Sequence, residues 1–268
     1  MKVFVNWFKT EMRAAGLYRA DFLLRLCYSF IAMYGVCSLW QALYRQDPGL
    51  VGRPLQAMVT YAMLAVALDI VFYPSALKSA PQNYIADQVR TGRIDTDLLR
   101  PRDLQSQLLA RNAAVALFSL LWLVLPAWLL GVFFLGMELP ATALCAVAFA
   151  VSVALGFFIL FSLNFLLGLV CFVTLDIRQI TMAYSGILTI LSGKLIPNWL
   201  YPEWMQAVIR ALPFRCIFEM PLNIYTGALA EREIVLGICL QGFWALALFC
   251  FGRLAWRKVH RRLSVQGG

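Results

Sequence analysis

Long apolar runs separated by short polar segments dominate the chain. Several runs approach or exceed the roughly 20 residues that a helix needs to cross a bilayer. The pattern predicts six spans, at about 22–44, 56–77, 110–136, 140–174, 178–196 and 233–256. No internal repeat or linker is evident, so we expect an all-α polytopic membrane protein with one domain over residues 1–268.

The fourth run is ambiguous because of its length. At about 1.5 Å per residue, a helix over 140–174 would be roughly 50 Å long, against a hydrocarbon core of about 30 Å. Either one helix protrudes from the bilayer, or it breaks near Gly156, Asn164 or Gly168.

The distribution of positive charge predicts the orientation of the spans. With six spans and a cytoplasmic N-terminus, 17 of the 23 lysines and arginines lie on the cytoplasmic side, as the positive-inside rule requires. An extra crossing in the fourth run would move the basic C-terminal tail outside. We therefore expect both termini in the cytoplasm.

Composition agrees with a membrane protein. The chain is 62% hydrophobic and 14% charged, whereas soluble domains carry about 25% charged residues. The net charge of +9 lies mainly at the cytoplasmic rims, where anionic lipid head groups attract it. This distribution argues against a nucleic-acid partner.

Residues 1–20 have a helical pattern of their own. Phe4, Trp7, Phe8 and Met12 recur at helical spacing, with basic and polar residues on the other side. This pattern predicts an amphipathic helix that lies in the membrane interface.

The segment 85–103, "IADQVRTGRIDTDLLRPRD", places eight charged residues among nineteen, between two apolar runs. Gly92 is suited to end one short helix, and Asp103 is suited to cap the third span. Four positions form an apolar stripe: Ile85, Val89, Ile94 and Leu98. A solvated loop is one interpretation; a docking site is the other, because the stripe would otherwise be exposed.

Residues 197–232 follow the fifth span and contain two short helical stretches, each too short and too polar at its edges to span the membrane. Pro202 can begin a short helix that Pro213 ends, and we expect Pro221 to break a second one. The aromatic content suits partly inserted re-entrant helices at the outer leaflet. An amphipathic loop on the surface is the alternative.

Polar residues within the spans are candidates for a transport pathway. Asp69 is a pathway or relay carboxylate, or it pairs with another helix or reaches the inner interface near Lys78. Asn164 makes an interhelical hydrogen bond or lines a pathway. Small polar groups also recur on the fifth span, where helix packing explains them nearly as well: Thr181, Tyr184, Ser185, Thr189 and Ser192. Pro126 should mark a kink in the third span.

The sequence offers little for chemistry within the chain. The chain has one histidine, His260, and its seven cysteines lie mostly in apolar runs. We therefore expect no metal centre. A phosphate-binding loop needs G-x-x-x-x-G-K-[ST], yet Leu195 follows the Gly193-Lys194 pair. We therefore expect neither a catalytic residue nor ATP hydrolysis.

Two motifs carry a family resemblance. "VRTGRIDTDLLRP", residues 89–101, resembles the G-x-(I/L)-D-x-x-L-x-(R/K)-P signature of ABC-2 type transporter permeases. "SGKLIPNWLYPEWMQAVIRALPFRCIFEMPLNIYTG", residues 192–227, is similar to the segment after the fifth span in that family. The chain is most like the small permeases that lack a fused ATPase.

The resemblance implies a permease subunit of an ATP-driven exporter in a bacterial cytoplasmic membrane. Such permeases form dimers, with either an identical copy or a second permease, and bind two cytoplasmic ATPase subunits that hold ATP and Mg. Residues 1–20 would be the elbow helix, and 78–109 the coupling region. The coupling residues would be Ile85, Val89, Arg90, Gly92, Arg93, Ile94, Asp95, Leu98, Arg100 and Pro101. The re-entrant segment would include Pro197, Pro202, Trp204, Pro213, Phe214, Pro221, Tyr225 and Gly227.

Two other classes are alternatives. An intramembrane lipid-modifying enzyme needs clustered acid, histidine or lysine side chains at one depth. A secondary transporter usually has inverted repeats and paired charges at the midplane. Neither pattern is evident in the sequence, and the cargo is not indicated.

Overall fold

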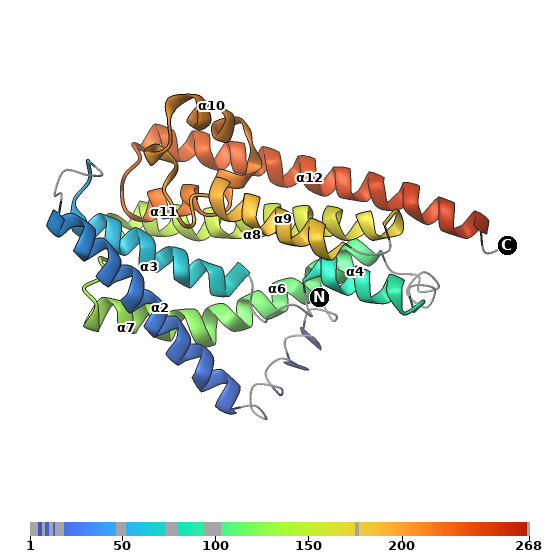
Figure 1. The fold of residues 1–268 in the computed structure, drawn as a ribbon, viewed down its shortest axis with the longest axis horizontal. Coiled ribbons are helices and arrows are strands. Elements are labelled where there is room, and N and C mark those ends of the chain that lie inside the picture. The colour runs from blue at the N-terminus through green and yellow to red at the C-terminus, as the bar shows by residue number, and fades with distance from the viewer. Residues whose placement is uncertain are drawn as a thin grey trace.

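The computed structural model describes residues 5–6, 9–10, 13, 19–46, 52–72, 80–93, 103–174 and 177–266. Within these ranges the regular structure is helical, without a strand. Most long helices run along the long axis of the molecule, and α12 projects past the others at one end (Figure 1). Residues 5–6, 9–10 and 13 are helical and exposed, but most of the expected elbow helix over 1–20 falls outside the described residues.

Among the described residues, five helical stretches are long and apolar enough to cross a membrane. The all-helical membrane class expected from the sequence is thereby confirmed. Helix α6 continues through a π-helical segment, Leu120–Val124, into α7. The stretches lie in α2 (Arg19–Gln46), α3 (Leu55–Phe72), α6 to α7 (Leu104–Ser119 and Leu125–Phe134), α8 (Ala143–Leu169) and α12 (Glu231–Gln266).

The predicted fifth span is shorter than expected. Helix α9 covers Arg178–Leu191, 14 residues, or roughly 21 Å at 1.5 Å per residue. The chain turns at Ser192 and Gly193, where the Tyr61 hydroxyl of α3 donates a hydrogen bond to the Gly193 carbonyl over 2.8 Å. Residues 192–196 therefore belong to a turn, and α9 alone is too short for a complete crossing.

The fourth run forms one continuous helix. Helix α8 begins after Thr142, whose side chain accepts a hydrogen bond from the Cys145 amide, and a 3-10 turn, Val170–Phe172, follows it. The helix passes through Gly156, Asn164 and Gly168 without a break. Of the two alternatives, the single long helix is the one observed.

Pro126 coincides with the expected irregularity in the third span. The Leu125 amide bonds to the Leu120 carbonyl, five residues back, at the end of the π-helical segment. Proline has no amide hydrogen, and π-helical turns are a common way for a helix to accommodate the loss. The sequence predicted a kink at Pro126; the structure shows a π-helical segment directly before α7, which contains this proline.

Helix α8 lies at the centre of the packing. It runs beside α12, and it contacts α4 (Pro81–Arg90) at one end and α11 (Glu219–Tyr225) at the other (Figure 1). Buried residues of α4, α6 and α8 form one apolar cluster near α4. We call this region the α4 end and the opposite region the α11 end.

A close approach joins α4 to α8. A Cβ atom on Gly168 would lie 2.8 Å from the Ile85 Cδ1 atom and 3.0 Å from the Gln82 Cα atom. These distances are too short for ordinary carbon contacts. Glycine at position 168 therefore allows the α4 backbone to pack directly on α8.

Replacing Gly168 with alanine should lower the thermal unfolding midpoint in detergent. Alanine favours an isolated helix by about 1 kcal/mol over glycine, but overpacking at a close contact costs about 1–3 kcal/mol. Gly35→Ala is the matched control, because no atom lies within 4 Å of a Cβ there. Equal midpoints for the two variants would contradict the proposed close packing.

Candidate functional site

Helix α4 lies in the predicted coupling region, 78–109, of which the structure describes residues 80–93 and 103–109. It ends with the Thr91 amide bonded to the Asp87 carbonyl, and Gly92 follows with φ +68°. The Gly92 amide bonds to the Val89 carbonyl over 3.2 Å. Gly92 thus ends the helix in the left-handed conformation that glycine adopts readily, as predicted.

Asp103 caps α6, the beginning of the third span, also as predicted. Its Oδ2 atom accepts hydrogen bonds from the Ser106 amide at 2.9 Å and from the Ser106 hydroxyl at 2.7 Å. Its Oδ1 atom lies 2.7 Å from the Arg253 Nη1 atom of α12. The carboxylate therefore joins two helices in addition to capping one.

The apolar positions of α4 face the protein itself. Ile85 has no exposed surface and packs with Leu108 and Phe165, and Val89 is half-buried against the same cluster. The expectation that Ile85 offers apolar contact to a partner is therefore corrected: its side chain is occupied by α8. The apolar side of α4 attaches this helix to α6 and α8.

The opposite face of α4 is polar and exposed. Asp87 and Arg90 form an ion pair at 3.6 Å, with 51% and 78% of their side-chain surface exposed. Thr91, Gly92 and Arg93 continue this surface. The remaining predicted coupling residues lie outside the described residues: Ile94, Asp95, Leu98, Arg100 and Pro101.

Residues 192–230, which we call the 192–230 segment, form short helices at the α11 end. A 3-10 turn, Asn198–Leu200, precedes α10 (Glu203–Ala211), and a second, Pro213–Cys216, precedes α11. Pro202 and Pro213 begin and end the α10 region as predicted. Pro221 does not break α11, because it is in the first turn, where helix amides lack intrahelical partners.

The 192–230 segment is largely packed into the protein. All residues of α11 are buried, which argues against a loop that only rests on the surface. The Tyr225 hydroxyl donates to the Glu138 carbonyl at 3.0 Å and accepts from the Trp128 ring nitrogen at 2.9 Å. Of the other predicted residues, Pro197 is buried, Phe214 is partly buried, Gly227 is exposed and Trp204 is 71% exposed.

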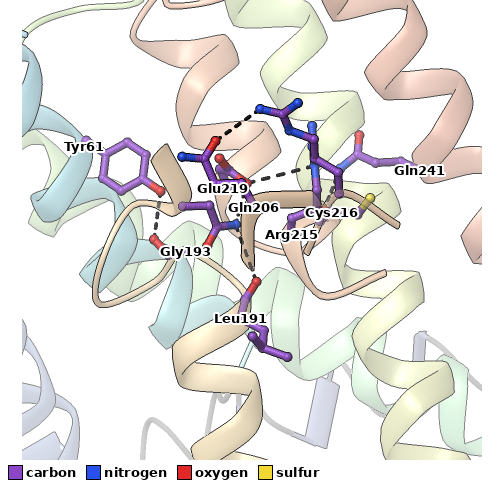
Figure 2. A network of polar contacts seen from close by, with 10 residues as sticks. Tyr61, Leu191, Gly193, Gln206, Arg215, Cys216, Glu219 and Gln241 are labelled. Atoms are coloured by element: carbon purple, nitrogen blue, oxygen red, sulfur yellow. Dashed lines mark hydrogen bonds and ion pairs between the residues drawn. The ribbon is translucent and has the colours of Figure 1, made fainter. Parts of the chain in front are cut away.

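Glu219 is the centre of a buried polar network (Figure 2). Its Oε2 atom accepts a hydrogen bond from the Asn198 amide nitrogen at 2.6 Å and lies 4.0 Å from the Arg215 Nε atom. The Glu219 residue is buried, with 9% of its surface exposed. Sequence reasoning missed this site: Arg215 and Glu219 are four residues apart, but Asn198 joins them only in the fold, from 21 positions away.

Helix α12 contacts the 192–230 segment beside this network, through Gln241. The Gln241 Nε2 atom donates to the Cys216 carbonyl at 2.7 Å and to the Ser152 carbonyl of α8 at 3.2 Å. Gln241 has no exposed surface. One amide group therefore holds the 192–230 segment against both long helices.

Arg53 contacts the segment from the beginning of α3. Its guanidinium lies 3.7 Å from the centre of the Trp199 ring, and its Nη1 atom donates to the Asn223 side chain at 3.1 Å. Burial removes water from the Arg53 guanidinium and therefore lowers its pKa. A stacked guanidinium that also donates a hydrogen bond ties α3 to both ends of the segment.

Asp69, a predicted pathway residue, forms an ion pair that the sequence did not reveal. The Lys194 Nζ atom lies 2.6 Å from the Asp69 Oδ1 atom, and the two side chains are 28% and 35% exposed. This pairing is one of the alternatives considered for Asp69. The turn at Gly193 lets the Lys194 side chain reach α3.

The other predicted pathway residues divide into two groups. Asn164 of α8 is buried, with 3% of its surface exposed. Its Oδ1 atom has no hydrogen-bond donor in the described part of the chain. Ser185 and Thr189 of α9 donate to backbone carbonyls of their own helix. Asn164 lies on α8, apart in sequence from the other predicted residues. Those residues lie on α9 or at its end: Thr181, Tyr184, Ser185, Thr189 and Ser192.

Comparison with known proteins gives one finding. A family model described as ABC-2 family transporter protein matches residues 30–267. The match spans α3, α4, the 192–230 segment and α12. The chain has no significant match to a curated protein or to a solved structure.

Removing one member of the Asp69–Lys194 pair should destabilise the protein more than removing both. Asp69→Asn or Lys194→Gln takes away a charged hydrogen-bond partner, at a cost of about 1–3 kcal/mol. The double variant should recover part of the loss, because neither charge then loses its partner. Thermal unfolding midpoints in detergent measure the coupling.

Asp87→Asn is the control for this double-mutant cycle. The Asp87–Arg90 pair is exposed, and such pairs contribute about 0–1 kcal/mol. Strictly additive effects at positions 69 and 194 would show that the two side chains do not interact.

Proposed function

The chain belongs to the ABC-2 transporter family and is a membrane permease of an ABC exporter, and from that premise we propose that it works with a separate cytoplasmic ATPase subunit. The observation that carries the proposal is the construction of α4. Its apolar side is held on α8, and its exposed side presents Asp87, Arg90 and Arg93 at the α4 end. A short helix held firmly by its apolar side can transmit movement imposed on its polar side.

We further propose that residues 78–109 form the coupling region and that the ATPase contacts its polar face. Arg90 and Arg93 would then contact acidic groups, in place of the apolar stripe. ATP and Mg would be bound by the ATPase, two copies of which serve each complex. This chain would contribute no catalytic residue.

The proposed topology has six crossings, with both termini in the cytoplasm. Helix α9 would begin at the cytoplasmic side, and the turn at Gly193 with the packed 192–230 segment would complete the outer half of the fifth crossing. Residues 197–232 would be the re-entrant segment, and residues 1–20 the elbow helix. The basic end of α12 would then lie at the cytoplasmic surface, as the positive-inside rule favours.

We propose that the permease acts as a dimer in a bacterial cytoplasmic membrane, with a second copy or a related permease. The exposed apolar side of α9 supports this, since Met182, Ile187 and Ile190 are 68%, 48% and 46% exposed. Cargo would pass along the seam between the two subunits. The candidate pathway residues Asp69, Ser185 and Thr189 would then lie near that seam.

Charge reversal on the polar face of α4 tests the proposal. The double variant Arg90→Glu with Arg93→Glu, co-expressed with a cognate ATPase, should retain about tenfold less ATPase on affinity purification. Losing about 1.4 kcal/mol of binding energy is enough for this change. The measured quantity is the molar ratio of ATPase to permease.

Arg210→Glu is the matched control. Arg210 is an exposed arginine on α10, at the opposite end of the molecule, so its reversal should leave the ratio unchanged. Equal ratios for the α4 variant and the wild type would contradict the proposed docking face.

A further inference from the structure

Three contacts within little more than one helical turn fix α12 to the beginning of α6. The Arg253 Nη1 atom lies 2.7 Å from the Asp103 Oδ1 atom. The Gln105 Nε2 atom donates to the Phe249 carbonyl at 3.1 Å. A Cβ atom on Gly252 would lie only 3.0 Å from that Gln105 nitrogen, so glycine allows the two helices to approach there.

Both ends of the proposed coupling region are therefore attached to long helices. On one side α4 packs on α8 through Ile85 and Gly168. On the other side Asp103 and Gln105 bind α12. Helices α8 and α12 in turn pack against each other.

The same two helices reach the 192–230 segment. On α12, Gln241 binds the Cys216 carbonyl, and Ile234 packs with Met220 and Ile224. On α8, a Cβ atom at Gly156 would lie 3.0 Å from the Ile217 carbonyl oxygen. From Arg253 to Ile234 the helix spans roughly 28 Å at 1.5 Å per residue. Helix α12 thus connects the coupling region to the 192–230 segment without interruption.

We propose that Arg253 is a positioning residue that transmits movement of the coupling region into α12, through its ion pair with Asp103. Displacement of residues 85–103 by the ATPase moves α6 at its capped end. The ion pair and the Gln105 contact require α12 to follow, and α12 carries the movement to the 192–230 segment. The inference rests on the proposed function, because it needs an ATPase that acts on the coupling region.

Helix α2 provides a reference that this route does not include. It packs mainly on α3 and α7. Movement along α12 should therefore change the distance between the α4 ends of α2 and α12. Leu24 and Lys258 are exposed positions at these two places.

Electron–electron distance measurements on spin labels test the proposal. Labels are placed at Leu24→Cys and Lys258→Cys, after the exposed Cys27, Cys239 and Cys250 are changed to serine. The permease–ATPase complex is compared without nucleotide and after trapping with ATP, magnesium and vanadate. The wild type should show a shift of about 2 Å or more, the scale of helix movements in switching proteins.

Arg253→Gln and Asp103→Asn should each abolish this shift while the ATPase still co-purifies. Asparagine is as good a helix cap as aspartate, so Asp103→Asn removes the charge and keeps the beginning of α6. Arg257→Gln is the matched control, because Arg257 is an exposed arginine one turn further along α12. It should leave the shift unchanged.

The outcomes separate the two proposals. A shift that persists in both variants, or is absent from a wild-type complex that forms normally, overturns the role of Arg253 alone. Failure of the wild-type permease to bind any ATPase overturns the proposed function, and this inference with it. A variant that unfolds is recognised by its unfolding midpoint, and the other variant then decides.

Discussion

Close packing on α8 is the contact on which the rest of the structure depends. Two glycines, Gly156 and Gly168, allow the 192–230 segment and α4 to approach its backbone at opposite ends. In a bilayer, helices gain little from burying apolar surface against one another, so close van der Waals contact at small residues becomes decisive. Helix α8 therefore sets the position of both proposed working ends.

Buried polar groups impose the second constraint, because burying a polar group without a hydrogen bond costs free energy. In the 192–230 segment Asn198 donates to Glu219, and Arg215 lies 4.0 Å from the same carboxylate. Gln241 of α12 donates to the Cys216 carbonyl. These bonds hold short helices that could not be stable alone, and they connect the segment to the long helices.

The two constraints give the α4 end and the α11 end different surfaces. At the α4 end, an apolar attachment leaves a polar face exposed, which suits contact with a soluble partner. At the α11 end, Glu219, Asn198 and Gln241 are buried and form hydrogen bonds within the protein. Helices α8 and α12 join these regions, so a displacement at one end has a direct mechanical route to the other.

Local signals in the sequence determined much of this protein. Apolar runs predicted the membrane helices, Gly92 and Asp103 the helix ends, and Pro202 and Pro213 the limits of the α10 region, because each depends on a few neighbouring residues. Only the tertiary structure decided that Ile85 faces α8, that α9 ends early, and that Lys194 reaches Asp69. The last pair is separated by 125 positions, and no local pattern specifies which distant partner a buried charge or an apolar face will meet.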